Sequence, residues 1–352
     1  MNPTGRETQT SLKWLMQVLK GVSRSFYLSV RILRRPLRKP IGVAYLLARA
    51  SDTIADTPVL DWRERLQLLE DFQVVVAGGI VSGFDGSSGR LGLEDPGEIT
   101  LMKHLPEILE YFQAMDGEER REIVSVIDTI VSGQSLDIRR FDSQDHIVAL
   151  KNAGELDDYT YRVAGVVGEF WTRISHLKGM FSDKNVFDRA LICGVRLGKG
   201  LQLVNILRDL PGDLARNRCY LPQDALESVG LSPADLIQKE LEPRFRPVYR
   251  KWLEMARDHL RAGWEYVLMV PPREKLMRLA CAWPVLIGFA TIQKLEGANP
   301  LDAGKVKVPR KWIYRMIRLS LVTMIFPKAI ENLPARVLGK ELAEQCLTRP
   351  QS

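Results

Sequence analysis

Helical periodicity is the feature that most constrains the fold of this chain. Apolar residues recur at intervals of three and four, which places them along one face of an α-helix. Strand-like alternation of apolar and polar residues between turns is scarce. The periodic segments are residues 41–56, 62–77, 100–115, 119–140, 186–210, 245–269, 274–296 and 311–325. The sequence therefore predicts an all-α fold, a single helical bundle around a central cavity.

The interruptions of this pattern are few. Residues 82–97, 211–223 and 296–309 are the clearest loops, rich in Gly, Ser, Asp, Asn and Pro. No Pro/Gly-rich linker divides the 352 residues, and no repeat of fixed period is visible. We therefore expect one domain. Its expected limits are residues 19–330, with an N-terminal segment at 1–18 and a polar, peripheral C-terminal tail at 331–352.

The formal net charge is +7, and a basic surface suits phosphate, nucleic acid or an anionic membrane. The cations gather at Arg31, Arg34, Arg35, Arg38 and Lys39, and again at Lys305, Lys307, Arg310, Lys311, Arg315 and Arg318. Neither cluster resembles a nucleic-acid module, so no nucleic-acid partner is expected. A solvated helix face is the alternative for each cluster.

The cysteines and the hydropathy pattern bear on the location of the protein. The four cysteines are widely spaced and match no metal-binding pattern, which favours a reducing cytoplasm. The N-terminus carries no signal-peptide pattern. The apolar run 281–292 contains a proline and is too short to span a bilayer. We expect a cytoplasmic protein that is at most peripheral to a membrane, with the basic and apolar segment 305–327 as its contact.

Two motifs place carboxylates four residues apart. The first is Asp52-Thr-Ile-Ala-Asp56, and the second is Asn205-Ile-Leu-Arg-Asp209-Leu-Pro-Gly-Asp213. Four residues advance about 400° around a helix, so the polar groups of each motif share one edge. Both motifs lie in apolar surroundings, and buried carboxylates need a cation or a hydrogen-bond partner.

Mg²⁺ is the cation that suits these two edges. It binds few protein carboxylates and completes its coordination with water and phosphate oxygens. Two such edges could hold Mg²⁺ ions over one diphosphate and offset the charge of a leaving pyrophosphate. Arg49 and Arg208 lie beside the motifs, and arginine binds phosphate through a planar fork. The alternative for either motif is that its carboxylates lie on the surface without a functional role. The alternative for Arg49 is that it only forms an ion pair with Asp52.

A third feature combines tyrosines with glycines, in Tyr159-Thr-Tyr161-Arg162-Val-Ala-Gly165-Val-Val-Gly168. Tyrosines that face a cavity could stabilise a carbocation through the ring or transfer a proton. Glycines are costly inside a helix, so something must approach the backbone closely at these positions. A prenyl chain and a second helix are both open explanations.

Together these pieces resemble the squalene and phytoene synthase family. The matching stretches are SRSFY at 23–27, YLLARASDTIAD at 45–56, YTYRVAGVVG at 159–168 and LQLVNILRDLPGD at 201–213. The resemblance implies an isoprenoid synthase fold and a prenyltransferase that condenses two farnesyl diphosphates head to head. The implied intermediate is a cyclopropyl diphosphate, presqualene diphosphate.

The resemblance also implies roles for individual residues. Metal ligands would be Asp52, Asp56, Asn205, Asp209 and Asp213. Substrate-binding residues would be Ser23, Arg24, Phe26, Tyr45, Arg49, Gln202, Asn205 and Arg208. Asp52 and Asp209 are also expected to be catalytic, with Tyr159 or Tyr161. Eukaryotic squalene synthases have a catalytic tyrosine where this chain has Arg162, and Pro211 predicts a kink before Asp213.

Within the family, the squalene-forming branch with NADPH as reductant fits best. Residues 281–292 (CAWPVLIGFATI) resemble that branch, and Lys305, Lys307 and Arg310 resemble a segment that helps to hold NADPH. Residues 214–222 (LARNRCYLP) are more like bacterial carotenoid enzymes. Phytoene or dehydrosqualene synthesis, and a synthase that stops at presqualene diphosphate or hydroxysqualene, are the enzymatic alternatives. A helical assembly protein without activity is the alternative from another class.

Overall fold

Helices account for about three quarters of the described chain, as the periodicity predicted. The computed structural model describes residues 11–82, 90–142, 145–302, 304 and 306–348, without the side chains of residues 24–26. It divides into two compact units. The first unit comprises the described residues of Met1–Ser143 and Arg173–Lys178, and the second comprises those of Gln144–Thr172 and Gly179–Ser352.

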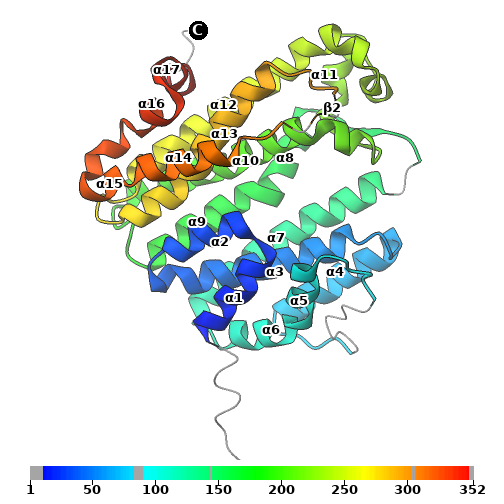
Figure 1. Cartoon of the computed structure of the whole chain (residues 1–352). Coiled ribbons are helices and arrows are strands. Elements are labelled where there is room, and N and C mark those ends of the chain that lie inside the picture. The colour runs from blue at the N-terminus through cyan, green and yellow to red at the C-terminus, as the bar shows by residue number, and fades with distance from the viewer. Residues whose placement is uncertain (1–10, 83–89, 143–144, 303, 305, 349–352) are drawn as a thin grey trace, which may run out of the picture. The chain divides into compact units, whose positions relative to one another are not determined.

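Helix α3 is the centre of the first unit. The helices of this unit are α1 (Leu12–Val22), α2 (Arg24–Ile32), α3 (Arg35–Asp56), α4 (Trp62–Val76), α5 (Pro96–Lys103), α6 (Leu105–Gln113) and α7 (Gly117–Phe141) (Figure 1). Helix α3 packs against α7, α4 and α1. Leu46, Leu47 and Ala50 of α3 and Ile127 of α7 are fully buried in this core. The first acidic motif therefore lies at the end of a helix fixed by neighbours on several sides.

Helix α10 has the same role in the second unit. The elements are β1 (Val148–Leu150), α8 (Ala153–Thr160), the π-helix η2 (Tyr161–Gly165), α9 (Val166–Leu177, which ends in the first unit), α10 (Lys184–Leu214), β2 (Arg218–Pro222), α11 (Gln223–Glu227), η3 (Pro233–Ile237), η4 (Lys239–Leu241), α12 (Glu242–Met269), α13 (Lys275–Glu296), α14 (Arg310–Ser320), α15 (Val322–Ile325), η5 (Pro327–Ile330), α16 (Leu333–Leu338) and α17 (Lys340–Leu347). Helix α10 packs along α12 and contacts η2 and α13. Strands β1 and β2 form a short parallel pair, which the sequence did not predict.

The second predicted loop, 211–223, begins four residues late, because α10 continues through Pro211 to Leu214. A proline inside a helix deprives the carbonyl four residues earlier of its usual donor. That carbonyl belongs to Leu207, and the hydroxyl of Tyr249 on α12 donates to it at 3.0 Å. The contact between α10 and α12 thus supplies the hydrogen bond that Pro211 removes, and Asp209 and Asp213 stay on one helix.

The C-terminal segment, expected to be a polar and peripheral tail, is packed into the second unit. Leu333 and Cys346 are fully buried, on α16 and α17 respectively. The Arg261 guanidinium of α12 donates to the carbonyl of Cys346 at 2.8 Å and to that of Gln345 at 3.2 Å. The segment is not peripheral, because apolar residues at helical spacing on each helix are buried: Leu333 and Val337 on α16, and Leu342 and Cys346 on α17. The domain limits drawn from the sequence stay predictions.

Two helices, α10 and α13, are long and apolar enough to cross a bilayer by length and composition. The apolar run 281–292 is part of α13, which is longer than the run itself. Of the most apolar stretch of α13, 72% is buried within the protein, as in the core helix of a globular unit. Length and composition alone are therefore weak evidence that either helix spans a membrane.

Candidate active site

The first acidic motif lies on one continuous helix. Tyr45, Arg49, Asp52 and Asp56 all belong to α3, so the two carboxylates share an edge as predicted. The Asp52 side chain is 43% exposed, and Asp56 is exposed. Both carboxylates are therefore accessible to a cation from solvent.

Asp52 is held by a residue that sequence reasoning missed. The side-chain amide of Gln134, on α7, donates to the Asp52 carboxylate at 2.6 Å and to the Ser51 hydroxyl at 3.1 Å. The pKa of Asp52 is raised to about 6, chiefly by burial; the charge of Asp56 also raises it, whereas Arg49 and Gln134 lower it. The raised pKa means that the ionised form of Asp52 is disfavoured, and a nearby cation would stabilise that form.

Arg49 makes two ion pairs in the first unit. Its guanidinium contacts the Asp52 carboxylate at 3.7 Å and forms a closer hydrogen bond to Glu98 of α5. The predicted alternative, pairing with Asp52, is therefore present, and Glu98 is an additional partner that the sequence did not indicate. The Arg49 side chain is 32% exposed, so part of the guanidinium is still accessible to an anion.

Ser23 and Tyr45 meet beside this edge. The two side chains form a hydrogen bond, and burial raises the pKa of Tyr45. Arg49 and Asp52 are close enough to Tyr45 to act on its charge. Ser23, Tyr45, Arg49 and Asp52 are thus brought together, whereas the predicted side chains of Arg24 and Phe26 lie outside the described residues.

The second acidic motif occupies the last turns of α10. The guanidinium of Arg208 makes two hydrogen bonds to the Asp209 carboxylate, at 2.9 and 2.5 Å. These side chains are 34% and 51% exposed. One turn earlier, the Asn205 amide donates weakly to Gln202 at 3.5 Å. The predicted amides, arginine and carboxylate therefore follow one another along one helix.

Asp213 differs from Asp209 in its surroundings. It is only 8% exposed, and burial raises its pKa. Arg216 donates to it at 2.7 Å and lowers the pKa, as does the charge of Arg218. Arg216 and Arg218 come from the segment that looked like a loop in the sequence, so their link to the acidic motif was not foreseen.

The two candidate tyrosines have different neighbours. The ring of Tyr159 is 8% exposed and stacks on Tyr220, with 4.7 Å between the ring centroids. The hydroxyl of Tyr161 donates to the Glu169 carboxylate at 3.0 Å, and the Lys199 ammonium lies 5.7 Å from its ring centroid. Tyr161 therefore has a polar partner suited to proton transfer. Tyr159 has one ring face covered.

The glycines of the third motif permit close helix packing. A Cβ atom at Gly168 would lie 1.8 Å from the carbonyl oxygen of Gly194 on α10. A Cβ atom at Gly198 would lie 2.1 Å from the carbonyl oxygen of Ala164. Of the two explanations that the sequence left open, the structure supports the approach of a second helix. The backbones of α10 and of the segment from η2 to α9 could not come this close with side chains present.

The basic residues expected to bind NADPH lie before and at the start of α14. Lys307 and Arg310 are exposed. Lys305 lies outside the described residues. The two described cations are accessible to a phosphate group.

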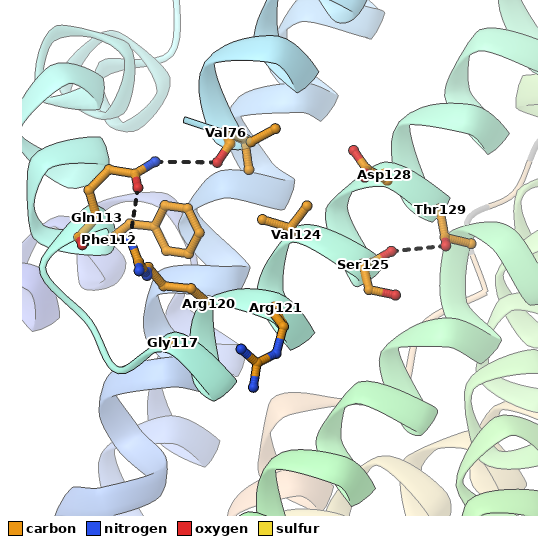
Figure 2. A pocket seen from close by; sticks show the side chains of 11 residues that line it. Val76, Phe112, Gln113, Gly117, Arg120, Arg121, Val124, Ser125, Asp128 and Thr129 are labelled. Carbon is orange, nitrogen blue, oxygen red and sulfur yellow. Dashed lines mark hydrogen bonds between the residues drawn. The ribbon is translucent and has the colours of Figure 1, made fainter. Parts of the chain in front are cut away.

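Two pockets lie apart from the acidic motifs. One, of about 630 Å³, is formed by the ends of α4 and α6 and the first half of α7, and includes Arg120, Arg121 and Asp128 (Figure 2). The other, of about 910 Å³, lies between α12 and the C-terminal segment and includes Arg257 and Arg261. Among the described residues, none of the predicted site residues lines either pocket.

The oxygen-rich donor set fits Mg²⁺. Among the described residues, no three acidic, histidine or cysteine side chains converge on one point. Mg²⁺ does not require such a cluster, because it keeps several waters and binds substrate phosphates. Asp52, which is partly exposed, and Asp213, which is buried, both have pKa values raised by the loss of hydration, so a cation would stabilise their ionised forms. Asp56, Asp209 and Asn205 are chemically suited as further ligands.

The sequence of the chain is similar to squalene, phytoene and presqualene diphosphate synthases. The family model described as "Squalene/phytoene synthase" matches residues 19–312. Presqualene diphosphate synthase of Zymomonas mobilis is 28% identical over 75% of this chain and 79% of its own length. Squalene synthase of Eremothecium gossypii is 27% identical over 86% of this chain and 66% of its own length. Chloroplastic phytoene synthase of an Oncidium hybrid is 25% identical over 89% of this chain and 67% of its own length.

Solved structures show the same fold. The complex of TcSQS with the ligand E5700 has a TM-score of 0.77 at 19% identity, covering 96% of both chains. Squalene synthase HpnC from Alicyclobacillus acidocaldarius has a TM-score of 0.60 at 16% identity, covering 84% of this chain and 97% of its own. The all-α isoprenoid synthase fold expected from the sequence is thereby confirmed.

Proposed function

This chain belongs to the squalene/phytoene synthase family, whose members are prenyltransferases, and we propose that it joins two farnesyl diphosphates head to head to form squalene. The route would pass through presqualene diphosphate and end with reduction by NADPH. One observation carries the proposal: α3 and α10 each present an acidic edge with an arginine beside it. That is the chemistry required to bind an isoprenoid diphosphate and release pyrophosphate.

The proposed binding roles follow from the contacts of each edge. Asp52 and Asp56 on one helix, and Asn205, Asp209 and Asp213 on the other, would hold Mg²⁺. When bound, Mg²⁺ supplies positive charge that offsets the charge of pyrophosphate. Arg49 and Arg208 would bind diphosphate oxygens, with Ser23, Tyr45 and Gln202 as further donors. Both arginines contact carboxylates in the chain itself, so substrate would replace or share those partners.

The remaining residues would act on the hydrocarbon and the reductant. Tyr161, hydrogen-bonded to Glu169, is the favoured residue for holding or moving a proton, and Tyr159 would contribute a ring face. Lys307 and Arg310, with Lys305, would bind phosphate groups of NADPH, which supplies hydride when bound. The activity would be cytoplasmic with a peripheral membrane contact, in keeping with four buried cysteines without disulfides and a hydrocarbon product.

A second candidate is a synthase that stops at presqualene diphosphate. The 28% identity to the Zymomonas mobilis presqualene diphosphate synthase favours it. Residues 281–292 and the basic residues before α14 favour the complete reaction. Phytoene or dehydrosqualene formation is a third outcome within the same family.

One product analysis distinguishes these candidates. The purified chain is incubated with farnesyl diphosphate and Mg²⁺, with and without NADPH, and the extracted products are identified by mass spectrometry. We expect squalene only when NADPH is present. Presqualene diphosphate or dehydrosqualene as the final product in both reactions would contradict the proposed branch. Absence of pyrophosphate release from any prenyl diphosphate would contradict the proposal as a whole.

The two acidic edges can be tested separately. Asp52→Asn and Asp209→Asn should each lower turnover by about a hundredfold or more, because each removes a charge that acts on the leaving group. Asp188→Asn is the matched control, since Asp188 is an exposed carboxylate on α10 that pairs with Lys184. Circular dichroism should show all three variants folded. Wild-type turnover in either edge variant would remove that edge from the proposed site.

A further inference from the structure

Helices α14 and α15 form an amphipathic element with a defined inner face. Met316, Ser320 and Thr323 are buried, and the indole N–H of Trp283 on α13 donates to the Ser320 hydroxyl at 3.1 Å. The element also contacts α16. These contacts fix which side of α14 and α15 points away from the core of the second unit. Figure 1 labels the two helices.

The outer face carries large apolar side chains that no described residue covers. Tyr314, Leu321 and Ile325 follow one another at helical spacing and are 67%, 53% and 72% exposed. Phe326, directly after α15, is 63% exposed. Single exposed apolar residues are ordinary, but four within thirteen residues on one element mark an interaction surface.

Cations surround these apolar side chains. Lys311 and Arg318 lie on the same stripe as Tyr314 and Leu321, with Arg315 and Lys328 nearby, and all four are exposed. Residues 303–330 contain no aspartate or glutamate. Among the described residues, none of these four cations forms a salt bridge. The surface therefore combines apolar side chains with positive charge that is not neutralised within the described protein.

We propose that this face, defined by Tyr314, Leu321, Ile325 and Phe326 with Lys311, Arg315, Arg318 and Lys328, docks on an anionic lipid surface. Apolar residues of an amphipathic helix enter the boundary between headgroups and acyl chains, and lysine and arginine bind the anionic headgroups. A second copy of the chain suits the face poorly. A two-fold contact would place the same cations opposite one another with no acid between them.

This proposal rests on the proposed function in one respect, since it assigns a surface to the peripheral membrane contact. Its failure is distinguishable from failure of the catalytic proposal, because lipid binding is measured without substrate. The full chain is sedimented with phosphatidylcholine vesicles that either contain or lack phosphatidylglycerol. We expect binding to the anionic vesicles only, weakened by added salt. The double variants Ile325→Ser/Phe326→Ser and Arg315→Gln/Arg318→Gln should each reduce the partition coefficient roughly tenfold or more.

Matched controls come from exposed residues elsewhere in the second unit. Ile237 is 65% exposed and Arg250 is exposed, so Ile237→Ser and Arg250→Gln should bind as the wild type does. Thermal melting checks that each variant is folded. Equal binding by the wild type and both double variants would overturn the proposal, as would equal binding to neutral and anionic vesicles. The proposal would also be overturned if the wild type dimerised in the absence of vesicles and the double variants did not. That result would assign the face to a second copy of the chain.

Discussion

Gln134 donates its side-chain amide to Asp52, the carboxylate whose pKa burial raises to about 6. That hydrogen bond favours the ionised form of Asp52, which is the form that binds a cation. The Gln134 carbonyl oxygen is buried without a hydrogen-bond partner in the described structure. Gln134 therefore serves the orientation and charge of Asp52 more than the stability of the core.

Replacing Gln134 by leucine should weaken activation by Mg²⁺ while leaving the fold intact. The pKa of Asp52 rises when the donor is lost, so the Mg²⁺ concentration for half-maximal activity should increase several-fold, most strongly at the acidic end of the active range. Stability should change by about 1 kcal/mol or less, because the unpartnered carbonyl is removed as well. Titration of activity with Mg²⁺ at several pH values measures the effect.

Gln73→Leu is the control for this prediction. Gln73 donates to Asp128 at 3.2 Å in the same unit, a bond of the same kind away from the acidic motif. It should leave Mg²⁺ activation unchanged. If Gln134→Leu and Gln73→Leu behave alike, the role assigned to Gln134 is wrong.

The sequence was sufficient to identify Asp52 and Asp56. It did not indicate Gln134, which donates to Asp52, or Glu98, which accepts from Arg49. The two aspartates are found by their spacing of four, which is a local property of a helix. Gln134 is 82 residues from Asp52, and Glu98 is 49 residues from Arg49. Such partners are chosen by packing between helices, and neither residue belongs to a pattern that would have indicated it.

At the scale of elements, α9 and α10 approach each other closely in the second unit. Gly168 and Gly194 face each other there, and a Cβ at Gly168 would lie 1.8 Å from the Gly194 carbonyl oxygen. That carbonyl is backbone and cannot yield as a side chain could. Gly168 is therefore required by geometry, whatever the enzyme binds.

Gly168→Ala should lower the free energy of unfolding by several kcal/mol, because the added methyl forces the two helices apart. Gly212→Ala is the contrasting change, since Gly212 lies in the same helix as Gly194 and a Cβ there meets nothing within 4 Å. It should be neutral or stabilising by up to about 1 kcal/mol. Urea unfolding followed by circular dichroism compares the two. A Gly168→Ala protein as stable as Gly212→Ala would contradict this packing.

The contact between α10 and α12 contains His259, which is uncharged in the folded protein at neutral pH. Burial, together with the charges of Arg196 and Lys199, lowers the pKa of His259 from its usual value to about 4. The Arg196 guanidinium donates to its ring nitrogen at 3.4 Å, which requires that nitrogen to be an acceptor. The opposing charges of Asp258 and Asp157 raise the pKa but do not prevail.

This histidine should make stability fall as the pH decreases from about 6.5 to about 4. In that window the unfolded chain binds a proton at His259 and the folded chain does not, so protonation favours unfolding. Above pH 6.5 both states are neutral and the contribution is constant. His259→Gln should therefore flatten the pH dependence of the unfolding free energy across this window by up to about 3 kcal/mol.

The comparison with wild type at each pH isolates the effect, because carboxylates titrate in both proteins. His146→Gln, at a side chain that is 68% exposed, serves as the control and should keep the wild-type slope. Urea unfolding between pH 4 and 8 is the measurement. An unchanged slope in His259→Gln would show that His259 does not cause the pH dependence.

At the scale of the whole molecule, the all-α class was predictable because helical periodicity is a local property that each segment shows by itself. The division into two units was not. Its boundary falls inside α9, between Thr172 and Arg173, where the helical pattern continues without a Pro/Gly-rich linker. A linker is a local signal, whereas the membership of one helix in two units depends on contacts with residues far away in the sequence.

A substitution in the C-terminal segment tests whether α16 and α17 belong to the core of the second unit. Leu333 of α16 is fully buried, whereas Leu276 of α13 is 36% exposed. Because Leu333 is packed in the core, Leu333→Ala should lower the unfolding free energy by about 2–5 kcal/mol, the cost of a cavity in a packed interior. Leu276→Ala should cost less than about 1 kcal/mol, because its side chain already contacts water. Equal and small losses would instead support the peripheral tail that its polar composition suggested, since a cavity cannot form where nothing is packed.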